Sequence, residues 1–463
     1  MMRLRELLLL LAASLGLSGC ASSLSSQPVP LRWTTGFWFW HGSAAGPAPS
    51  HAAVDVLFVH VGAIQRAGMG MLAPRTGDRR WLAYGQLPDR LPAAREYWVV
   101  FRYEGRGIPD AQAVPILAQT LSELQGAAQD RHLTIAGLQL DIDCPTESLA
   151  QYAGFLHEVK QRLPEGWKLS VTALLDWFRD GTDAGEVIGA ADEFVPQFYD
   201  AGDPDSREGP AAIAKKIDAR RWGPVFNRFR KPFRVGISSF GRARQVLGES
   251  ASPSPYGRVV FLRDIAPLDL ATNAAFELES GRNGVGELVL TYRAKRSVKV
   301  SYDSFERGDG VQFILATPEV VRQAVESARQ IGGRIAGVVF FRWPGQEESL
   351  TMQPDEVLEA AGEPGSGGAG HNRVRVVSGG CAAVECVDVY LEGADPFSAK
   401  AVRYRVRASG ELEYFIPDGG MPVQMTGPTQ LELRLPPFCA RGLLYLGRAV
   451  SKDRVEFTVE REP

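Results

Sequence analysis

Asp141 and Asp143 end an apolar segment, residues 135–143, and are the side chains best suited to acid–base chemistry. Side chains alternate between the two faces of an extended strand, so both carboxylates would share a face with Gln139. Two nearby carboxylates resist joint ionisation, so a desolvated Asp143 would have a raised pKa and would act as a general acid. Asp141 would stay charged, to orient Asp143 or to stabilise positive charge on a sugar. The alternative is that both carboxylates only cap backbone amides.

Polar residues at the ends of other apolar segments are candidates for binding a substrate. The predicted substrate-binding residues are Gln139, Tyr199, Gln197, Asp200, Asp176, Glu104 and Trp343. The Tyr199 hydroxyl would bind a carbonyl or hydroxyl group beside Gln197; the alternative is a buried tyrosine that is satisfied within the protein. Asp176 or Glu104 would supply the second carboxylate for hydrolysis, which requires carboxyl groups about 5–9.5 Å apart. Most tryptophans are expected in the core, but the Trp343 ring is expected to form the floor of the ligand site.

Eight apolar segments are predicted strands, the number that closes a parallel barrel. These segments are residues 35–40, 54–61, 97–103, 135–143, 169–175, 194–199, 233–238 and 337–343. Apolar residues at helical spacing predict helices at residues 113–128, 149–163, 211–217 and 318–331. Near-continuous apolar strands that alternate with helices predict an α/β fold, a (β/α)8 TIM-like barrel. The rival doubly wound sheet lacks a Gly-rich turn after its first strand. In such a barrel the candidate residues would meet at the carboxyl ends of the strands.

The barrel is predicted over residues 31–361, with an α+β insertion on its rim at residues 244–317, between the seventh and eighth strands. A Gly-rich linker follows at residues 362–372. Residues 373–463 alternate polar and apolar side chains between turns, which predicts a C-terminal β-sandwich.

Residues 1–20 have the pattern of an export signal, in which basic residues precede an apolar run too short to anchor a helix in a bilayer. The Leu-Ser-Gly-Cys run at its end resembles the bacterial lipobox, so Cys20 would carry a lipid. Ala21 stands where an aspartate would signal retention in the inner membrane. The expected location is therefore the outer membrane, facing the periplasm, with residues 21–30 as a tether.

Composition excludes several classes of partner. Hydrophobic residues make up 45% of the chain and charged residues 23%, as in ordinary globular proteins. A net charge of -3 without a basic cluster predicts no nucleic-acid partner. No cofactor and no metal are expected, because neither a phosphate-binding loop nor a clear ligand set is present.

An oxidising compartment would allow disulfides among Cys144, Cys381, Cys386 and Cys439. Cys381 or Cys386 could pair with Cys439, although spacing leaves the connectivity open.

Residues 136–143 resemble the D-G-x-D-x-D-x-E strand of family 18 glycoside hydrolases, with Gly137 and Asp141 in matching positions. Residues 198–200 are similar to the tyrosine-bearing sixth strand of that family, and Trp343 stands where its eighth strand has a tryptophan. The stretches G-L-Q-L-D-I-D-C-P and F-V-P-Q-F-Y-D more closely resemble a bacterial lipoprotein family catalogued as domain of unknown function 3142. The resemblance to the glycoside hydrolases implies a barrel that acts on a glycan.

The chain departs from the hydrolase pattern at three positions. Asp143 replaces the catalytic glutamate with a shorter side chain, and Ala136 and Gln139 replace the first two acids. The predicted function is that of an envelope lipoprotein that cleaves a polysaccharide or peptidoglycan-type glycan, with Asp143 as the acid and Asp141 as its partner. The alternative, which the substitutions favour, is a barrel that binds a glycan or an envelope protein without catalysis. A purely structural lipoprotein is the third hypothesis.

Overall fold

The structure is a computed structural model. It describes residues 31–40, 54–66, 81–103, 105, 107–199, 212–248, 267–301, 303–345, 348, 350–363, 372–381, 384–392, 401–436 and 443–462. The predicted signal, Cys20 and the tether lie outside the described residues, as do Glu104, Asp200 and Cys439. Of the helices in the described part of the chain, none combines the length and the apolar character needed to cross a bilayer.

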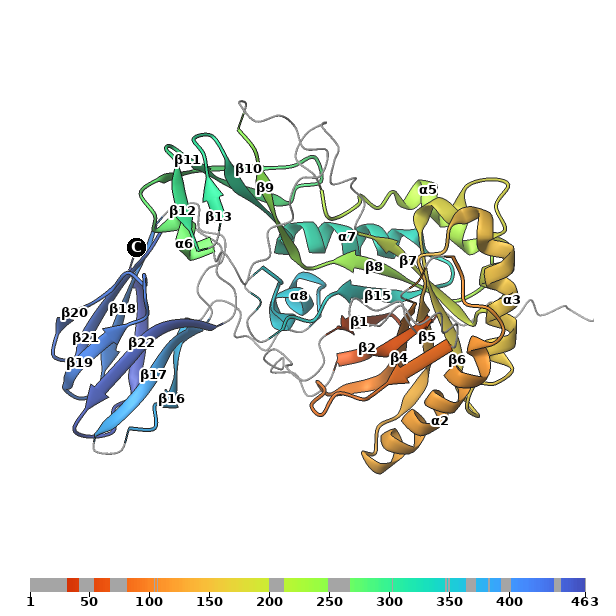
Figure 1. The fold of residues 1–463 in the computed structure, drawn as a ribbon, viewed down its shortest axis with the longest axis horizontal. Coiled ribbons are helices and arrows are strands. Elements are labelled where there is room, and N and C mark those ends of the chain that lie inside the picture. The colour runs from red at the N-terminus through yellow and green to blue at the C-terminus, as the bar shows by residue number, and fades with distance from the viewer. Residues whose placement is uncertain are drawn as a thin grey trace, which may run out of the picture. The chain divides into compact units, whose positions relative to one another are not determined.

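Eight parallel strands close into a barrel, as the spacing of apolar segments predicts (Figure 1). They are β1 (Thr34–Phe39), β2 (Val54–Arg66), β4 (Ala94–Tyr103), β5 (Ile135–Asp141), β6 (Lys168–Ala173), β7 (Glu193–Phe198), β8 (Phe233–Ser238) and β15 (Ile335–Phe341). Strand β1 pairs in parallel with both β15 and β2, which closes the ring. The sequence did not predict β3 (Trp81–Gly85), which adds to β2 in the antiparallel direction outside the ring.

Helices follow most barrel strands and surround them in Figure 1. The helical segments are α2 (Ala113–Asp130), η1 (Thr146–Ser148), α3 (Leu149–Lys160), η2 (Leu175–Phe178), α4 (Ala184–Ala190), α5 (Ala219–Asn227), α6 (Pro267–Ala271), α7 (Pro318–Ile331) and α8 (Pro354–Ala360). Three of the four predicted helices are confirmed, as α2, α3 and α7. Helix α7 begins as its sequence indicates, because the Thr317 hydroxyl accepts the amide of Val320 and Pro318 occupies the first turn.

The fourth predicted helix covers residues 211–217. The structure describes residues 212–217 of it, and they are not helical, so this prediction is wrong. Their backbone donors bind groups outside the segment: Ile213 and Ala214 donate to the Glu287 carboxylate, and Lys215 donates to a carbonyl of β7. Tertiary partners therefore override the helical spacing of the apolar residues. Helix α5 begins only after Asp218, whose side chain caps it.

Strand alternation divides the apolar residues between two cores. Leu138, Leu140 and Ile142 point outward into the layer between strands and helices. Inside the ring, Trp38 and Trp98 belong to a second, smaller cluster of aromatic and branched side chains. Because Gln139 and Asp141 alternate with the outward residues of β5, they face the barrel interior, as the sequence predicts.

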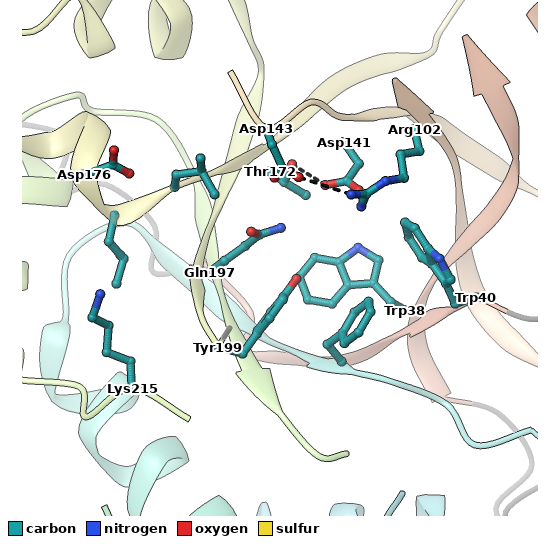
Figure 2. Close-up of a pocket in the computed structure, with 13 residues that line it drawn as sticks. Trp38, Trp40, Arg102, Asp141, Asp143, Thr172, Asp176, Gln197, Tyr199 and Lys215 are labelled. Atoms are coloured by element: carbon teal, nitrogen blue, oxygen red, sulfur yellow. Dashed lines mark hydrogen bonds and ion pairs between the residues drawn. The ribbon is translucent and has the colours of Figure 1, made fainter. Parts of the chain in front are cut away.

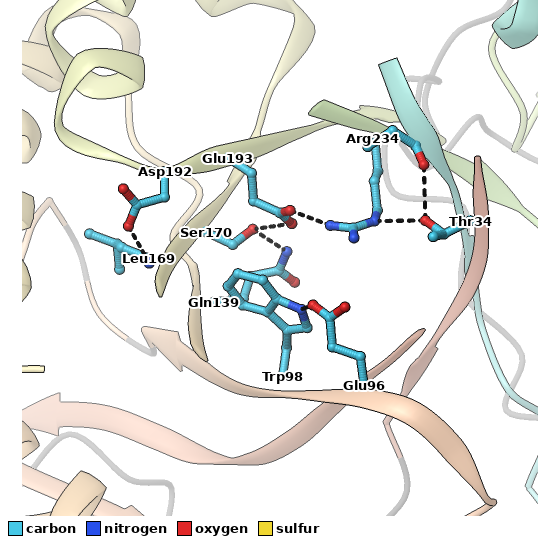
Figure 3. Close-up of polar contacts among 10 residues, drawn as sticks. Thr34, Glu96, Trp98, Gln139, Leu169, Ser170, Asp192, Glu193 and Arg234 are labelled. Atoms are coloured by element: carbon cyan, nitrogen blue, oxygen red, sulfur yellow. Dashed lines mark hydrogen bonds and ion pairs between the residues drawn. The ribbon is translucent and has the colours of Figure 1, made fainter. Parts of the chain in front are cut away.

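Polar side chains inside the ring form a chain of contacts, which we call the interior polar chain (Figure 3). Glu193 of β7 forms an ion pair with Arg234 of β8 and accepts a hydrogen bond from the Ser170 hydroxyl at 3.2 Å. Gln139 donates to Ser170 at 3.0 Å and accepts from the Trp38 indole at 2.6 Å. The interior polar chain therefore extends from the buried ion pair to an aromatic ring of β1.

The insertion between β8 and β15 is mainly antiparallel sheet. Strands β9 (Gly241–Val246), β10 (Phe276–Arg282), β11 (Leu288–Ala294) and β14 (Gly310–Leu315) form one sheet, and β12 (Val298–Val300) and β13 (Asp303–Phe305) form a hairpin. We call residues 241–315 the rim insertion. Strand β11 pairs with β14, and β12 pairs with β13, both in the antiparallel direction.

The C-terminal region forms two further antiparallel sheets of four strands each. One contains β16 (Arg373–Ser378), β17 (Glu385–Glu392), β22 (Leu443–Ser451) and β19 (Leu412–Pro417); the other contains β20 (Val423–Gly427), β21 (Gln430–Leu435), β18 (Val402–Ala408) and β23 (Phe457–Glu462). A disulfide joins Cys381, which follows β16, to Cys386 in β17. The suggested pairing with Cys439 is therefore wrong, since both possible partners are already bonded to each other.

Arg234→Met should destabilise the barrel strongly. The side chains of Arg234 and Glu193 are only 7% and 9% exposed, so the substitution leaves a buried carboxylate without its cation. Removal of one partner of a buried pair costs about 3–5 kcal/mol of unfolding free energy. The matched control is Arg282→Met, which breaks an exposed pair with Glu319 and should cost at most about 1 kcal/mol. Urea unfolding monitored by tryptophan fluorescence measures both; equal costs would contradict the assignment.

Candidate functional site

A cavity of about 490 Å³ opens at the carboxyl ends of the barrel strands. Five of the predicted site residues line it together: Asp141, Asp143, Asp176, Gln197 and Tyr199. They come from β5, from β7 and from the segments that follow β5, β6 and β7, so only the closed ring brings them into one place. The cavity is within the size range of small-ligand sites, which is about 300–1,000 Å³.

Arg102 of β4 bridges the two carboxylates on one wall of the cavity (Figure 2). Its Nη1 lies 2.9 Å from Oδ2 of Asp141, and its Nη2 lies 3.2 Å from Oδ2 of Asp143. The Thr172 hydroxyl donates to the other oxygen of Asp141 at 2.8 Å. Parallel pairing of β4 with β5 sets Arg102 opposite Asp141, which explains the bridge.

The environment of Asp143 differs from the one that the sequence predicted. The Asp143 side chain is 55% exposed, whereas the Asp141 side chain is 6% exposed. The Arg102 guanidinium also places a positive charge between the two carboxylates. Asp143 is therefore neither desolvated nor opposed by an unscreened like charge, which are the two conditions that the general-acid hypothesis required.

Aromatic rings form the floor of the cavity. We call Trp38, Trp40, Tyr199 and Phe341 the aromatic floor; Trp38 is only 1% exposed, so its part is to support Tyr199 and Phe341 and not to offer a face to a ligand. The Tyr199 and Phe341 rings stack with centroids 5.0 Å apart, and Trp38 meets Tyr199 edge-on at 5.8 Å. The edge of Trp40 lies against Phe341 at 5.7 Å.

The prediction that Trp343 forms this floor is wrong. Strand β15 ends at Phe341, and Trp343 is fully buried in the outer core, edge-on to Phe37 with centroids 5.3 Å apart. A ring with no exposed surface has no face to offer to a ligand. Phe341, two residues earlier and on the cavity side of the strand, occupies the place expected for the tryptophan.

Gln139 also has a different role from the predicted one. Its side chain is fully buried, and both ends of the amide are used, by Trp38 and by Ser170. Gln139 therefore holds the Trp38 ring through its indole NH group and does not line the cavity.

The opposite wall contains Asp176 and Lys215 (Figure 2). Asp176 lies in η2 and accepts a hydrogen bond from the Thr146 hydroxyl at 3.1 Å. Lys215 is exposed and comes from the non-helical segment after β7. Figure 2 shows Gln197 and the Tyr199 hydroxyl pointing toward the centre, between this wall and the wall of Arg102. Lys215 is not among the residues predicted from the sequence, because its segment has the apolar spacing of a helix.

Neither a reactive thiol nor a group of metal ligands is found at the cavity in the part of the chain that the structure describes. Cys144 follows Asp143 directly, but burial, with a smaller effect of Glu147, raises the pKa of its thiol to about 12. A thiol of this kind is a poor nucleophile at neutral pH. Within the described ranges, no three His, Cys, Asp or Glu side chains are grouped so that they would hold a metal ion.

Residues 93–302 match the family model described as "Domain of unknown function (DUF3142)". This stretch includes strand β5, the segment after β7 and most of the rim insertion. No curated protein matches the chain.

Several solved structures are similar in backbone fold. The spore cortex-lytic enzyme SleL of Bacillus cereus is 13% identical with a TM-score of 0.43, over 73% of this chain and 75% of that chain. Chitinase ChiA74 of Bacillus thuringiensis is 8% identical with a TM-score of 0.46, over 93% of this chain and 100% of that chain. A glycoside hydrolase family 18 N-acetylglucosaminidase of Paenibacillus barengoltzii is 12% identical with a TM-score of 0.41, over 71% and 99%.

Cys144 should resist alkylation in the folded protein between pH 7 and pH 9. Its thiolate fraction stays small until the pH approaches the raised pKa of about 12. An ordinary cysteine has a pKa of about 8.5, so its reaction with an alkylating reagent speeds up between pH 7 and pH 9. Iodoacetamide labelling followed by peptide mapping measures the modification at Cys144. The control is the same protein in urea, in which the peptide should label fully; rapid native labelling would contradict the buried position.

Proposed function

We propose that the cavity binds a glycan. The observation that carries this proposal is the combination of an aromatic floor with two polar walls in one open cavity. Aromatic rings match the apolar faces of sugars, and fixed polar groups around them match sugar hydroxyls. The ring packing holds the floor residues in place before a ligand enters, and such preorganisation reduces the entropic cost of binding.

The polar walls offer both donors and acceptors. Arg102 and Lys215 can donate, Asp143 and Asp176 can accept, and the Tyr199 hydroxyl can do either. Sugar hydroxyls also donate and accept, so they fit a mixed set better than an anion or an apolar ligand does. This mixed character supports a polysaccharide or a peptidoglycan-type glycan as the ligand class.

Cleavage of the glycan is the second candidate function. It is favoured by the position of the exposed Asp143 carboxylate on the cavity wall, across from the carboxylate of Asp176. For Asp143 to protonate a glycosidic oxygen, it would have to release Arg102 and take up a proton. Asp141 would keep its hydrogen bonds from Thr172 and Arg102 during this step. The Arg102 bridge opposes this sequence of events, so binding without catalysis is our preferred function.

We place this activity in the cell envelope. The lipobox-like sequence ending at Cys20 supports a lipid anchor in the outer membrane, with the barrel in the periplasm. A glycan of the periplasm or the cell wall would then be within reach. An envelope protein is the alternative partner in that location.

Trp40→Ala should weaken glycan binding by about three- to tenfold, because the substitution removes one stacking ring of the aromatic floor. Isothermal titration of the protein from Ser22 onward with peptidoglycan fragments and with acidic, N-acetylated and neutral oligosaccharides measures the affinity. Tyr414→Ala is the matched control, since this tyrosine is exposed on β19 of a C-terminal sheet and does not line the cavity. Equal losses in the two variants would contradict a specific role for the floor.

Asp143→Asn should leave folding intact, because the Asp143 side chain is exposed and the residue lies beyond the end of β5. On our preferred function, the wild type retains the glycan without releasing product over a long incubation, and the variant does the same. Chromatography of the incubation mixtures across pH 4–8 measures the product. Product from the wild type that is absent with Asp143→Asn would establish the second candidate and make Asp143 catalytic.

A further inference from the structure

Lys215 reaches the cavity on a short segment that has no regular secondary structure of its own. On one side this segment is fastened to the end of β7: the Lys215 amide donates to the Phe198 carbonyl at 2.9 Å, and Ala214 forms an isolated antiparallel bridge with Tyr199. Lys215 is thus adjacent to a residue of the aromatic floor. Two backbone contacts alone would leave the other side of the segment without support.

The second support is a carboxylate of the rim insertion. Glu287, directly before β11, is 0% exposed. Its Oε1 accepts the Ala214 amide at 2.9 Å, and its Oε2 accepts the Ile213 amide at 3.0 Å and the Asn283 side-chain amide at 2.8 Å. A buried carboxylate is costly unless its oxygens are satisfied, and here every contact is a donor. The amides of Ile213 and Ala214 therefore fix the Glu287 side chain, and the same hydrogen bonds hold the segment in place.

Apolar packing joins the same elements. Ile213 lies in a small buried cluster with Phe240 and with Ile314 of β14, and Phe341 of the aromatic floor packs against this cluster. The segment that carries Lys215 is thus held by charge-assisted hydrogen bonds and by apolar contacts, both of which come in part from the rim insertion.

We propose that Glu287 is a positioning residue for the ligand cavity: it fixes the backbone at Ile213 and Ala214 so that the Lys215 ammonium donates hydrogen bonds to oxygens of the bound glycan. The inference rests on the proposed glycan binding and makes the rim insertion part of the ligand site. A lysine side chain has large rotamer freedom, so a fixed backbone anchor limits the volume that its ammonium samples.

The isosteric change Glu287→Gln tests this arrangement. A carboxamide has one acceptor oxygen, so its NH2 group must face at least one of the amide donors of Ile213 or Ala214. Asn283 cannot compensate by reversing its own amide, because its Oδ1 already accepts the backbone amides of Val285 and Glu287. One backbone amide of the segment therefore loses its partner, although the shape of the side chain is kept.

The experiment is a double-mutant cycle with Glu287→Gln, Lys215→Met and the double variant. The probes are tetra-N-acetylchitotetraose and the disaccharide of N-acetylglucosamine and N-acetylmuramic acid, with affinities measured by titration calorimetry. Lys215→Met should weaken binding by about ten- to a hundredfold, as expected for loss of hydrogen bonds from a charged donor. Glu287→Gln should weaken binding in the wild-type background and have no further effect in the Lys215→Met background.

Three controls separate positioning from general damage. Lys215→Arg should keep the affinity within about threefold, since a cationic donor remains. Glu279→Gln, at an exposed ion pair on β10 of the same insertion, should change nothing. Hydrogen exchange should be faster at the amide of residue 213 or of residue 214 in Glu287→Gln, whatever ligand is present.

The outcomes distinguish this inference from the proposed function. Additive losses in the cycle, or unchanged exchange at the two amides, would overturn the positioning role while glycan binding stands. Failure of the wild type to bind either probe would overturn this inference. If the wider oligosaccharide panel also failed to bind, the proposed function would be overturned as well.

Discussion

The ion pair between Glu193 and Arg234 is the interaction on which the barrel interior depends. Both side chains lie inside the ring, where an unpaired charge would cost several kcal/mol, so each requires the other. The remaining Glu193 oxygen is satisfied by Ser170, and the interior polar chain continues through Gln139 to the Trp38 indole. The position of the Trp38 ring is therefore set in part by charges buried deeper in the barrel.

The fold was largely predictable because a parallel barrel buries both faces of its strands. This requirement produces the continuous apolar segments from which all eight strands were predicted. The spacing of apolar residues was not sufficient to predict the structure of residues 212–217, because two backbone amides of this segment donate to the distant Glu287 carboxylate. The match at Gly137 also has a packing cause: a Cβ there would lie 2.1 Å from the Lys168 carbonyl oxygen and 2.7 Å from the Trp98 ring. That match therefore carries information about the barrel and none about chemistry.

The candidate site was predictable only in part, because it depends on pairing between strands. Asp141 and Tyr199 were identified from their places at strand ends, and the cavity contains both. The bridge from Arg102 follows from the register of β4 on β5, which no single segment encodes. Phe341 and Trp343 differ by two residues, and only the end of β15 determines which ring faces the cavity. Geometry between segments, more than residue type, decided these outcomes.

The departures from the hydrolase pattern have a common physical meaning. An acid at position 139 would lie in the interior polar chain, between Trp38 and Ser170, where the neutral amide uses a donor and an acceptor at once. With Gln139 neutral, the acidic groups of β5 are confined to its end, and Arg102 neutralises part of their charge there. A carboxylate that is bound by a guanidinium and open to solvent accepts hydrogen bonds well but is a poor proton donor. On the proposed function, these residues therefore suit a cavity that holds a sugar better than one that protonates its glycosidic bond.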